Sequence, residues 1–141
     1  MDFMLYRAEQ ERGIRQSEQG GVTDGGLETD YHVFTRLFHQ RSLLTEGEYE
    51  LCSRYYNFFR SLLSTPEYII YLQAPVDVVS KRFQKRSRAV EVSRLEDLAA
   101  QQVLIEEWLA GVKTSRVLTI DAAAEDAGYE KALERVSATI S

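Results

Sequence analysis

Apolar residues recur at helical spacing through the first half of the chain. Residues 3–16 place them among charged and amide side chains, which predicts a helix that stops before Gly20-Gly21. From Leu27 to Leu44 the apolar positions return at helical intervals, which predicts a second helix. Thr45-Glu46-Gly47-Glu48 has the pattern of a capping box, so a third helix is expected to begin there and extend to about Leu63.

The second half of the chain alternates predicted strands and helices. Its clearest element is the continuous apolar run Tyr68–Leu72, which is typical of a buried parallel strand. The other expected elements are a helix that begins at Ala74-Pro75, a helix from the capping-box pattern Ser93-Arg94-Leu95-Glu96 to Gly111, a strand at residues 116–121 and a helix at residues 126–140. This order predicts an α/β fold with a parallel sheet covered by helices.

Two aspartates follow predicted strands. Asp121 ends the strand at residues 116–121, and Asp24 ends a short strand predicted at Val22-Thr23-Asp24. Open parallel sheets bind ligands at the carboxyl ends of their strands. Asp24 and Asp121 are therefore candidate site residues.

The composition indicates a globular protein of one packed domain, since the 141 residues are 44% hydrophobic and 28% charged. The net charge of −5 and the lack of a continuous basic block argue against nucleic acid as a partner. Cys52 is the single cysteine, which fits a reducing compartment. Neither a signal peptide nor a membrane-spanning apolar run is present in the sequence, so we expect a cytoplasmic protein without a membrane partner.

One basic cluster carries candidate chemistry. Arg82 and Arg86 are four residues apart and share a helix face, and Arg88 follows in a loop. Three converging guanidinium groups would neutralise phosphate oxygens through bidentate bonds, as phosphoryl transfer requires. The alternative is a solvated basic helix end that is stabilised by the helix dipole. The charge pattern alone leaves both open.

The segments around this cluster resemble the deoxynucleoside kinase family. The matching segments are Pro66–Leu72 with Ala74-Pro75, the spacing Arg82-x3-Arg86-x-Arg88-x2-Glu91, the run Glu106-Glu107-Trp108-Leu109 and the strand Val117–Asp121. They look like the fourth strand, the lid, the following helix and the fifth strand of that family. The resemblance implies a P-loop kinase-like three-layer α/β fold, with residues 1–141 as a partial deoxynucleoside kinase domain.

The resemblance also implies roles for the lid residues. Arg82, Arg86 and Arg88 would bind the phosphates of the donor and stabilise charge during transfer, with Asp121 in the same nucleotide-binding region. Glu91 would accept a hydrogen bond from the 3′-hydroxyl of the sugar. Without the family, Glu91 is interpreted as an exposed surface acid.

Upstream, Asp24 to Asp30 occupies the place of the family's motif of an acid, arginine, serine and a later aspartate. Asp24 would lie near Mg²⁺ and the reacting 5′-oxygen, and Asp30 would pair with Arg7 to read the nucleobase. The alternative for the pair is two unrelated surface charges. Gly25 and Gly26 replace the arginine and the serine of the motif. This change either weakens the site or lets the backbone approach an anion.

The 141 residues do not contain the loop Gly-x4-Gly-Lys-Ser/Thr that cradles phosphates. The family's catalytic base and base-reading glutamine also belong upstream of the first residue. The expected fold therefore lacks the P-loop strand and its neighbour, which leaves unpaired strand edges. Either the true start lies before Met1, or the chain is a poorly stable fragment that is inactive alone.

The implied function is nucleotide salvage: transfer of the γ-phosphate of ATP or another nucleoside triphosphate, with Mg²⁺, to the 5′-hydroxyl of a deoxyribonucleoside. A thymidylate-type nucleotide kinase and a non-catalytic binding or assembly module remain the alternatives. The family commonly pairs through helices, so a homodimer is expected. The aromatic residues Tyr55, Tyr56, Phe58 and Phe59 are interpreted as core, with a dimer face as the alternative, and His32 and His39 as surface or substrate-wall residues.

Overall fold

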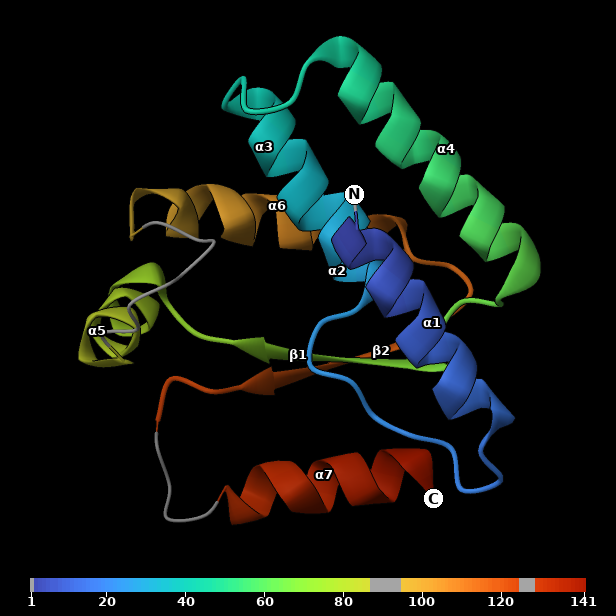
Figure 1. Ribbon diagram of the computed structural model, residues 1–141. Coiled ribbons are helices and arrows are strands. Elements are labelled where there is room, and N and C mark those ends of the chain that lie inside the picture. Colours follow the sequence, from blue (N-terminus) through green and yellow to red (C-terminus); the bar gives the residue numbers. More distant parts are fainter. Residues whose placement is uncertain (1, 87–94, 125–128) are drawn as a thin grey trace. The chain divides into compact units, whose positions relative to one another are not determined.

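The computed structural model describes residues 2–86, 95–124 and 129–141, and its elements follow the order shown in Figure 1. The chain divides into two compact units. The first comprises residues up to Thr65 together with Val103–Trp108, and the second comprises Pro66–Gln102 and Leu109–Ser141. Each unit is described in turn.

Helices build the first unit. They are α1 (Asp2–Gln16), α2 (Leu27–Thr29), the π-helix η1 (Asp30–Thr35), α3 (Arg36–Gln40) and α4 (Glu46–Leu62). The predicted helices at residues 3–16 and 45–63 are confirmed. The helix predicted from Leu27 to Leu44 is confirmed as far as Gln40.

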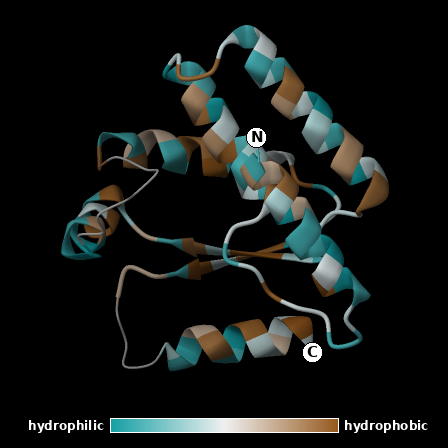
Figure 2. Cartoon of the chain, viewed as in Figure 1, coloured by the Kyte–Doolittle hydropathy of each residue, from teal (hydrophilic) through white to brown (hydrophobic). Residues whose placement is uncertain are grey.

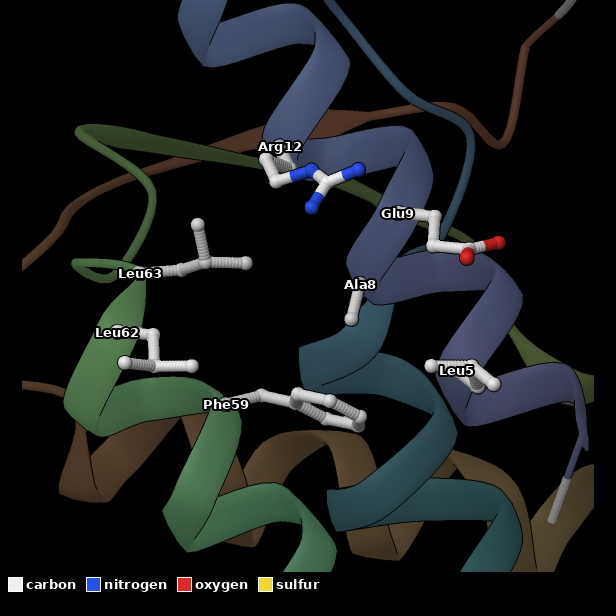
Figure 3. Close-up of a pocket in the computed structure, with 7 residues that line it drawn as sticks. All are labelled: Leu5, Ala8, Glu9, Arg12, Phe59, Leu62 and Leu63. Carbon is white, nitrogen blue, oxygen red and sulfur yellow. The ribbon is translucent and has the colours of Figure 1, made fainter.

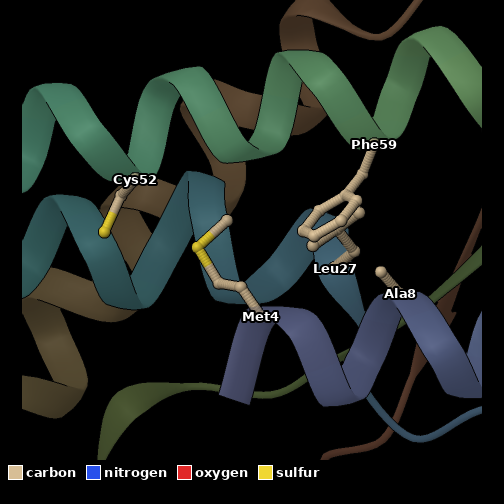
Figure 4. Packing of buried hydrophobic residues seen from close by; sticks show 5 residues of the cluster. All are labelled: Met4, Ala8, Leu27, Cys52 and Phe59. Atoms are coloured by element: carbon tan, nitrogen blue, oxygen red, sulfur yellow. The ribbon is translucent and has the colours of Figure 1, made fainter. Parts of the chain in front are cut away.

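A small apolar core joins α1, α2 and α4. Met4 and Ala8, one turn apart on α1, pack with Leu27 at the start of α2 and with Cys52 and Phe59 of α4. In Figure 4 the side chains of Cys52 and Phe59 point from α4 toward the other helices. Burial of such side chains is the main favourable contribution to folding. The core therefore fixes α1, which carries Arg7, and α2, which leads directly into Asp30.

The start of α4 confirms the predicted capping box. The backbone N–H of Glu48 donates to Oγ1 of Thr45 (3.3 Å), and the backbone N–H of Thr45 donates to Oε2 of Glu48 (2.8 Å). These reciprocal bonds satisfy two N–H groups that have no partner within the helix. The helix therefore begins where the sequence predicts.

The segment from α2 to α3 is helical throughout but widens at η1. Thr35 is fully buried, and its Oγ1 donates to the carbonyl oxygen of Asp30 at 2.8 Å. The helix ends at Gln40, four residues before the predicted end, because Ser42 adopts the left-handed conformation with φ of 55°. That conformation cannot continue a right-handed helix.

The second unit holds the parallel pair β1 (Tyr68–Gln73) and β2 (Arg116–Asp121). The register pairs Tyr68 with Arg116 and Gln73 with Asp121, so both carboxyl ends lie at one edge. Its other elements are α5 (Val76–Arg86), the 3-10 turn η2 (Leu95–Asp97), α6 (Leu98–Gly111, whose middle belongs to the first unit) and α7 (Glu130–Ile140). The mixed helix-and-strand fold and the parallel pairing confirm the coarse prediction. The predicted starts at Ser93 and residue 126 lie outside the described residues.

The strand predicted at Val22-Thr23-Asp24 is wrong. This stretch is irregular, and Val22 is 86% exposed. Gly20 and Gly25, at φ of 69° and 75°, turn the chain on both sides. A short stretch between such turns, without a pairing strand in the described part of the chain, gains no ladder of hydrogen bonds.

Both strands carry apolar residues, seen as brown segments in Figure 2, but the expected full burial of β1 is not observed. Residues Tyr68–Tyr71 are half-buried, and Leu72 is 59% exposed. In the described ranges the sheet has only these two strands, so no third strand covers or extends it. Whether a P-loop strand completes the sheet stays a prediction. Among the described helices, none is long and apolar enough to cross a bilayer.

Candidate functional site

Arg7 and Asp30 form an ion pair in the first unit. Arg7 lies on α1 and Asp30 at the start of η1, and Nε of Arg7 is 3.4 Å from Oδ2 of Asp30. The Asp30 side chain is 10% exposed and that of Arg7 is 31% exposed. The structure thus brings together the two residues that the sequence analysis assigned to the nucleobase, rather than leaving them as unrelated surface charges.

The Asp30 carboxylate is buried against Arg7. Its Oδ2 atom, the oxygen that faces Nε of Arg7, makes no well-aligned hydrogen bond among the described residues. Burial raises the pKa of Asp30, and the positive charge of Arg7 offsets part of that rise. A buried carboxylate without hydrogen bonds is unfavourable unless a ligand supplies them. The pair offers an acceptor and a cationic donor side by side, which matches the polar edge of a nucleobase.

A second buried charge cluster centres on Arg60 of α4, which the sequence analysis did not identify. Arg60 donates from Nη1 and Nη2 to the two carboxylate oxygens of Glu11 on α1, at 3.0 and 2.6 Å. Its Nε lies 2.9 Å from Oε1 of Glu28 in α2, an ion pair without hydrogen-bond alignment. Arg15 also donates to Glu11, at 3.0 and 3.1 Å. The only local signal was the spacing of Glu11 and Arg15, one helical turn apart.

Glu28 also connects this cluster to an aromatic group. The hydroxyl of Tyr56 donates to Oε2 of Glu28 (2.8 Å), and Nε2 of His32 lies 3.0 Å from the same hydroxyl oxygen. Burial and the Glu28 carboxylate raise the pKa of Tyr56, so this phenol stays protonated and donates. Tyr56 stacks on Tyr31, and His32 stacks on Trp108. His32 is therefore a half-buried packing residue in this unit.

Asp24 is exposed and lies in a bend rather than at a strand end. Gly25 and Gly26, at φ of 75° and 130°, adopt conformations that an arginine and a serine would rarely accept. The described residues contain no group of three His, Cys, Asp or Glu side chains that could hold a metal ion. They do not by themselves fit a metal centre, and contact of Asp24 with Mg²⁺ stays a prediction.

Two of the predicted phosphate residues, Arg82 and Asp121, lie near the carboxyl ends of the strands. Nη2 of Arg82, on α5, donates to the carbonyl oxygen of Ala123 just beyond β2 (3.2 Å). Asp121 ends β2 as predicted, and its carboxylate accepts the backbone N–H of Ala123 (2.9 Å). Arg86 is exposed at the end of the same helix.

The lid prediction is incomplete. Arg88 and Glu91 lie outside the described residues. Their assigned roles stay predictions, as does the convergence of the three arginines. The described geometry places Arg82 and Asp121 beside one loop at the carboxyl edge of the sheet, as the topology requires.

A separate pocket lies between α1 and α4 and is mostly apolar. Figure 3 shows Leu5, Ala8, Glu9, Arg12, Phe59, Leu62 and Leu63 around it. None of the residues predicted for the nucleoside or the phosphates lines it. This pocket therefore has no part in the predicted kinase site.

The comparisons with known proteins agree with the resemblance. The chain is 27% identical over 117 residues to the deoxyguanosine kinase of Bacillus subtilis (strain 168), covering 79% of this chain and 56% of that protein. It is 20% identical over 124 residues to the deoxyadenosine/deoxycytidine kinase of the same strain, covering 84% and 56%. The chain thus spans about half the length of these relatives. The sequence model described as deoxynucleoside kinase matches residues 1–141, so the chain belongs to the deoxynucleoside kinase family.

Proposed function

We propose that this chain supplies the nucleoside-binding and lid portion of an enzyme that transfers the γ-phosphate of a nucleoside triphosphate to the 5′-hydroxyl of a deoxyribonucleoside. Membership of the deoxynucleoside kinase family supports this reaction class. The observation that carries the proposal for this chain is the ion pair of Arg7 and Asp30, which joins a partly exposed cation to a buried carboxylate.

The pair is suited to a nucleobase because it combines a hydrogen-bond donor with a hydrogen-bond acceptor. A nucleobase edge presents an acceptor beside an amino or imino donor, and Arg7 donates while Asp30 accepts. The Asp30 oxygen that faces Arg7 is buried and makes no well-aligned hydrogen bond in the described part of the chain. A base that donates to this carboxylate displaces the side chains that cover it and supplies the missing hydrogen bond. Loss of such a charge-assisted bond weakens binding by about 1.5–3 kcal/mol.

Calorimetric titration of the chain with deoxyguanosine, deoxyadenosine, deoxycytidine and thymidine tests this role. We expect at least one deoxynucleoside to bind. Arg7→Gln should weaken its binding by about 10- to 100-fold, because each 1.4 kcal/mol of binding free energy corresponds to a tenfold change in affinity. Arg12→Gln is the matched control, because Arg12 is an exposed arginine of the same helix that lines the separate pocket. A folded chain that binds none of the four, or equal losses in both variants, contradicts the proposal.

The phosphate donor is proposed to contact the second unit. Arg82, Arg86 and Arg88 would neutralise its phosphate oxygens, with Asp121 nearby and Glu91 on the sugar. The position of Arg82 at the carboxyl edge of the strands supports this assignment. Several finer points stay predictions. They are ATP as the donor, its Mg²⁺ ion, a homodimer through helices, the partial-domain assignment, a cytoplasmic location and inactivity of the chain alone.

A non-catalytic binding module is the second candidate. The positive φ angles of Gly25 and Gly26, where the family pattern has arginine and serine, favour it. Transfer of labelled phosphate from ATP to a bound deoxynucleoside discriminates the two, and binding without turnover supports the module. Titration with thymidine monophosphate in parallel separates nucleoside binding from a thymidylate-type preference.

A further inference from the structure

We propose that Arg60 is a positioning residue that fixes Arg7 and Asp30 at their observed spacing and thereby sets the affinity for the nucleobase. This inference rests on the proposed function, because it assigns the pair to the base. Arg60 itself lies on α4, a different helix from those that carry the pair. It acts through two carboxylates, Glu11 and Glu28.

One guanidinium group contacts both carboxylates. Its terminal nitrogens bind the two oxygens of Glu11 in bidentate fashion, at 3.0 and 2.6 Å, and its Nε faces Glu28 at 2.9 Å. Nη1 also donates to the carbonyl oxygens of Leu63 and Ser64, at 3.2 and 2.7 Å, where α4 ends. The planar fork of arginine is suited to such simultaneous contacts, whereas lysine provides a single point charge.

Each carboxylate is close in sequence to a member of the pair. Glu11 lies four residues after Arg7 on α1, so the two side chains share a helix face. Glu28 lies two residues before Asp30, where α2 continues into η1. Arg60 therefore ties together the two helical segments whose separation determines the 3.4 Å contact between Arg7 and Asp30.

The three side chains that make these contacts are largely buried. The side chains of Arg60 and Glu28 are each 11% exposed, and that of Glu11 is 16% exposed. Removing one partner of a buried pair leaves an uncompensated charge, which drives the chain to rearrange or admit water. Without Arg60, Glu11 keeps Arg15, but Glu28 keeps only Tyr56 and His32 among the contacts described. The expected movement is therefore at α2, immediately before Asp30.

The main test is a double-mutant cycle in nucleoside binding. Arg60→Lys weakens binding of the preferred deoxynucleoside by about tenfold, since small displacements of binding groups have large effects. If Arg60 acts through the pair, Arg60→Lys with Arg7→Gln binds no more weakly than Arg7→Gln alone. Additive losses mean that Arg60 affects binding independently of the pair, which overturns the proposal. Arg54→Lys is the control, because Arg54 is an exposed arginine of the same helix.

A second readout needs no nucleoside. The Nε–Hε resonance of Arg7 in the free chain reports its pairing with Asp30, and it shifts in Arg60→Lys but not in Arg54→Lys. An unchanged resonance in folded Arg60→Lys overturns the positioning role. If the wild-type chain binds no deoxynucleoside while the resonance shifts as expected, the proposed function fails and the structural coupling stands.

Discussion

At the scale of single residues, the buried carboxylates differ in what their surroundings do to them. Burial raises the pKa of Glu11, but hydrogen bonds and positive charge from Arg60 and Arg15 outweigh it and lower the pKa overall. Asp30 has Arg7 at a longer distance, and burial prevails there. Glu11 is thus a structural carboxylate, whereas the charge of Asp30 is less fully compensated by its surroundings.

Glu11 should make the first unit sensitive to acid. Because its pKa in the folded chain is below the ordinary value of 4.5, its stabilisation is fully present above that pH and is lost as the pH falls through the folded pKa. Glu11→Gln should lower the free energy of unfolding at neutral pH by about 1–3 kcal/mol and remove part of the acid dependence. Urea denaturation at several pH values measures both effects.

Glu9→Gln is the control for this prediction, since Glu9 is an exposed glutamate on the same helix. We expect its unfolding profile to follow that of the wild type across the acid range. If the stability of Glu11→Gln fell with acid as steeply as that of the wild type, another carboxylate would be responsible for the acid sensitivity.

The residue scale also shows what the sequence could and could not reveal. The pairing of Arg7 with Asp30 was accessible only through the family motif. Arg60 was not accessible at all, because its partners Glu11 and Glu28 are far from it in sequence and no local periodicity records such contacts. Its position on an amphipathic helix made it resemble any polar residue of that helix.

At the scale of elements, α4 has the start that is best defined by sequence. Thr45→Ala removes the hydroxyl that accepts from Glu48 and should lower the free energy of unfolding by about 1 kcal/mol. Thr45→Ser keeps an oxygen at the same position and should stay close to the wild type. Chemical denaturation followed by circular dichroism compares the two, and equal losses would argue against the cap.

The π-helix η1 supports a second prediction for an element. Thr35→Val keeps the side-chain shape but removes the bond from Oγ1 to the Asp30 carbonyl, at 2.8 Å in a fully buried site. The expected result is a loss of about 1–3 kcal/mol, because a buried acceptor loses its partner. A variant as stable as the wild type would mean that the carbonyl finds another donor. Amide hydrogen exchange across residues 30–35 locates the change.

Elements with local determinants were predicted well, and those that depend on distant partners were not. The capping box of α4 and the strands β1 and β2 follow from short patterns. The strand at Val22-Thr23-Asp24 failed because a strand needs a neighbour that the described residues do not supply. The π-helix was missed because the apolar positions Tyr31, Phe34 and Leu37 keep helical spacing across it.

At the scale of the whole molecule, the two-stranded sheet leaves apolar side chains in solvent. Leu72 on β1 is 59% exposed and Val117 on β2 is 40% exposed. Exposed apolar strands with free edges are templates for association with other chains. The described part of the chain therefore combines a defined helical core in one unit with a partly exposed sheet in the other.

Leu72→Lys should reduce self-association of the chain, because a charge on an exposed strand disfavours pairing with a second chain. Leu133→Lys is the matched control, since Leu133 is 60% exposed on the helix α7. Light scattering at increasing protein concentration measures the effect. An equal reduction in both variants would indicate that net charge, rather than the sheet, governs association.

The π-helical turn has a consequence for comparing relatives. It holds one residue more than a regular α-helical passage, and each residue advances a helix by about 100°. Because the wider turn takes up this residue, a relative with a single-residue deletion between positions 30 and 35 would form a regular α-helix here and keep the phase of the following helix. Arg36, whose Nη2 donates to Glu107 at 2.8 Å, would then keep its direction. A one-residue alignment gap here therefore marks the loss of the wide turn rather than a shift of the helix that follows.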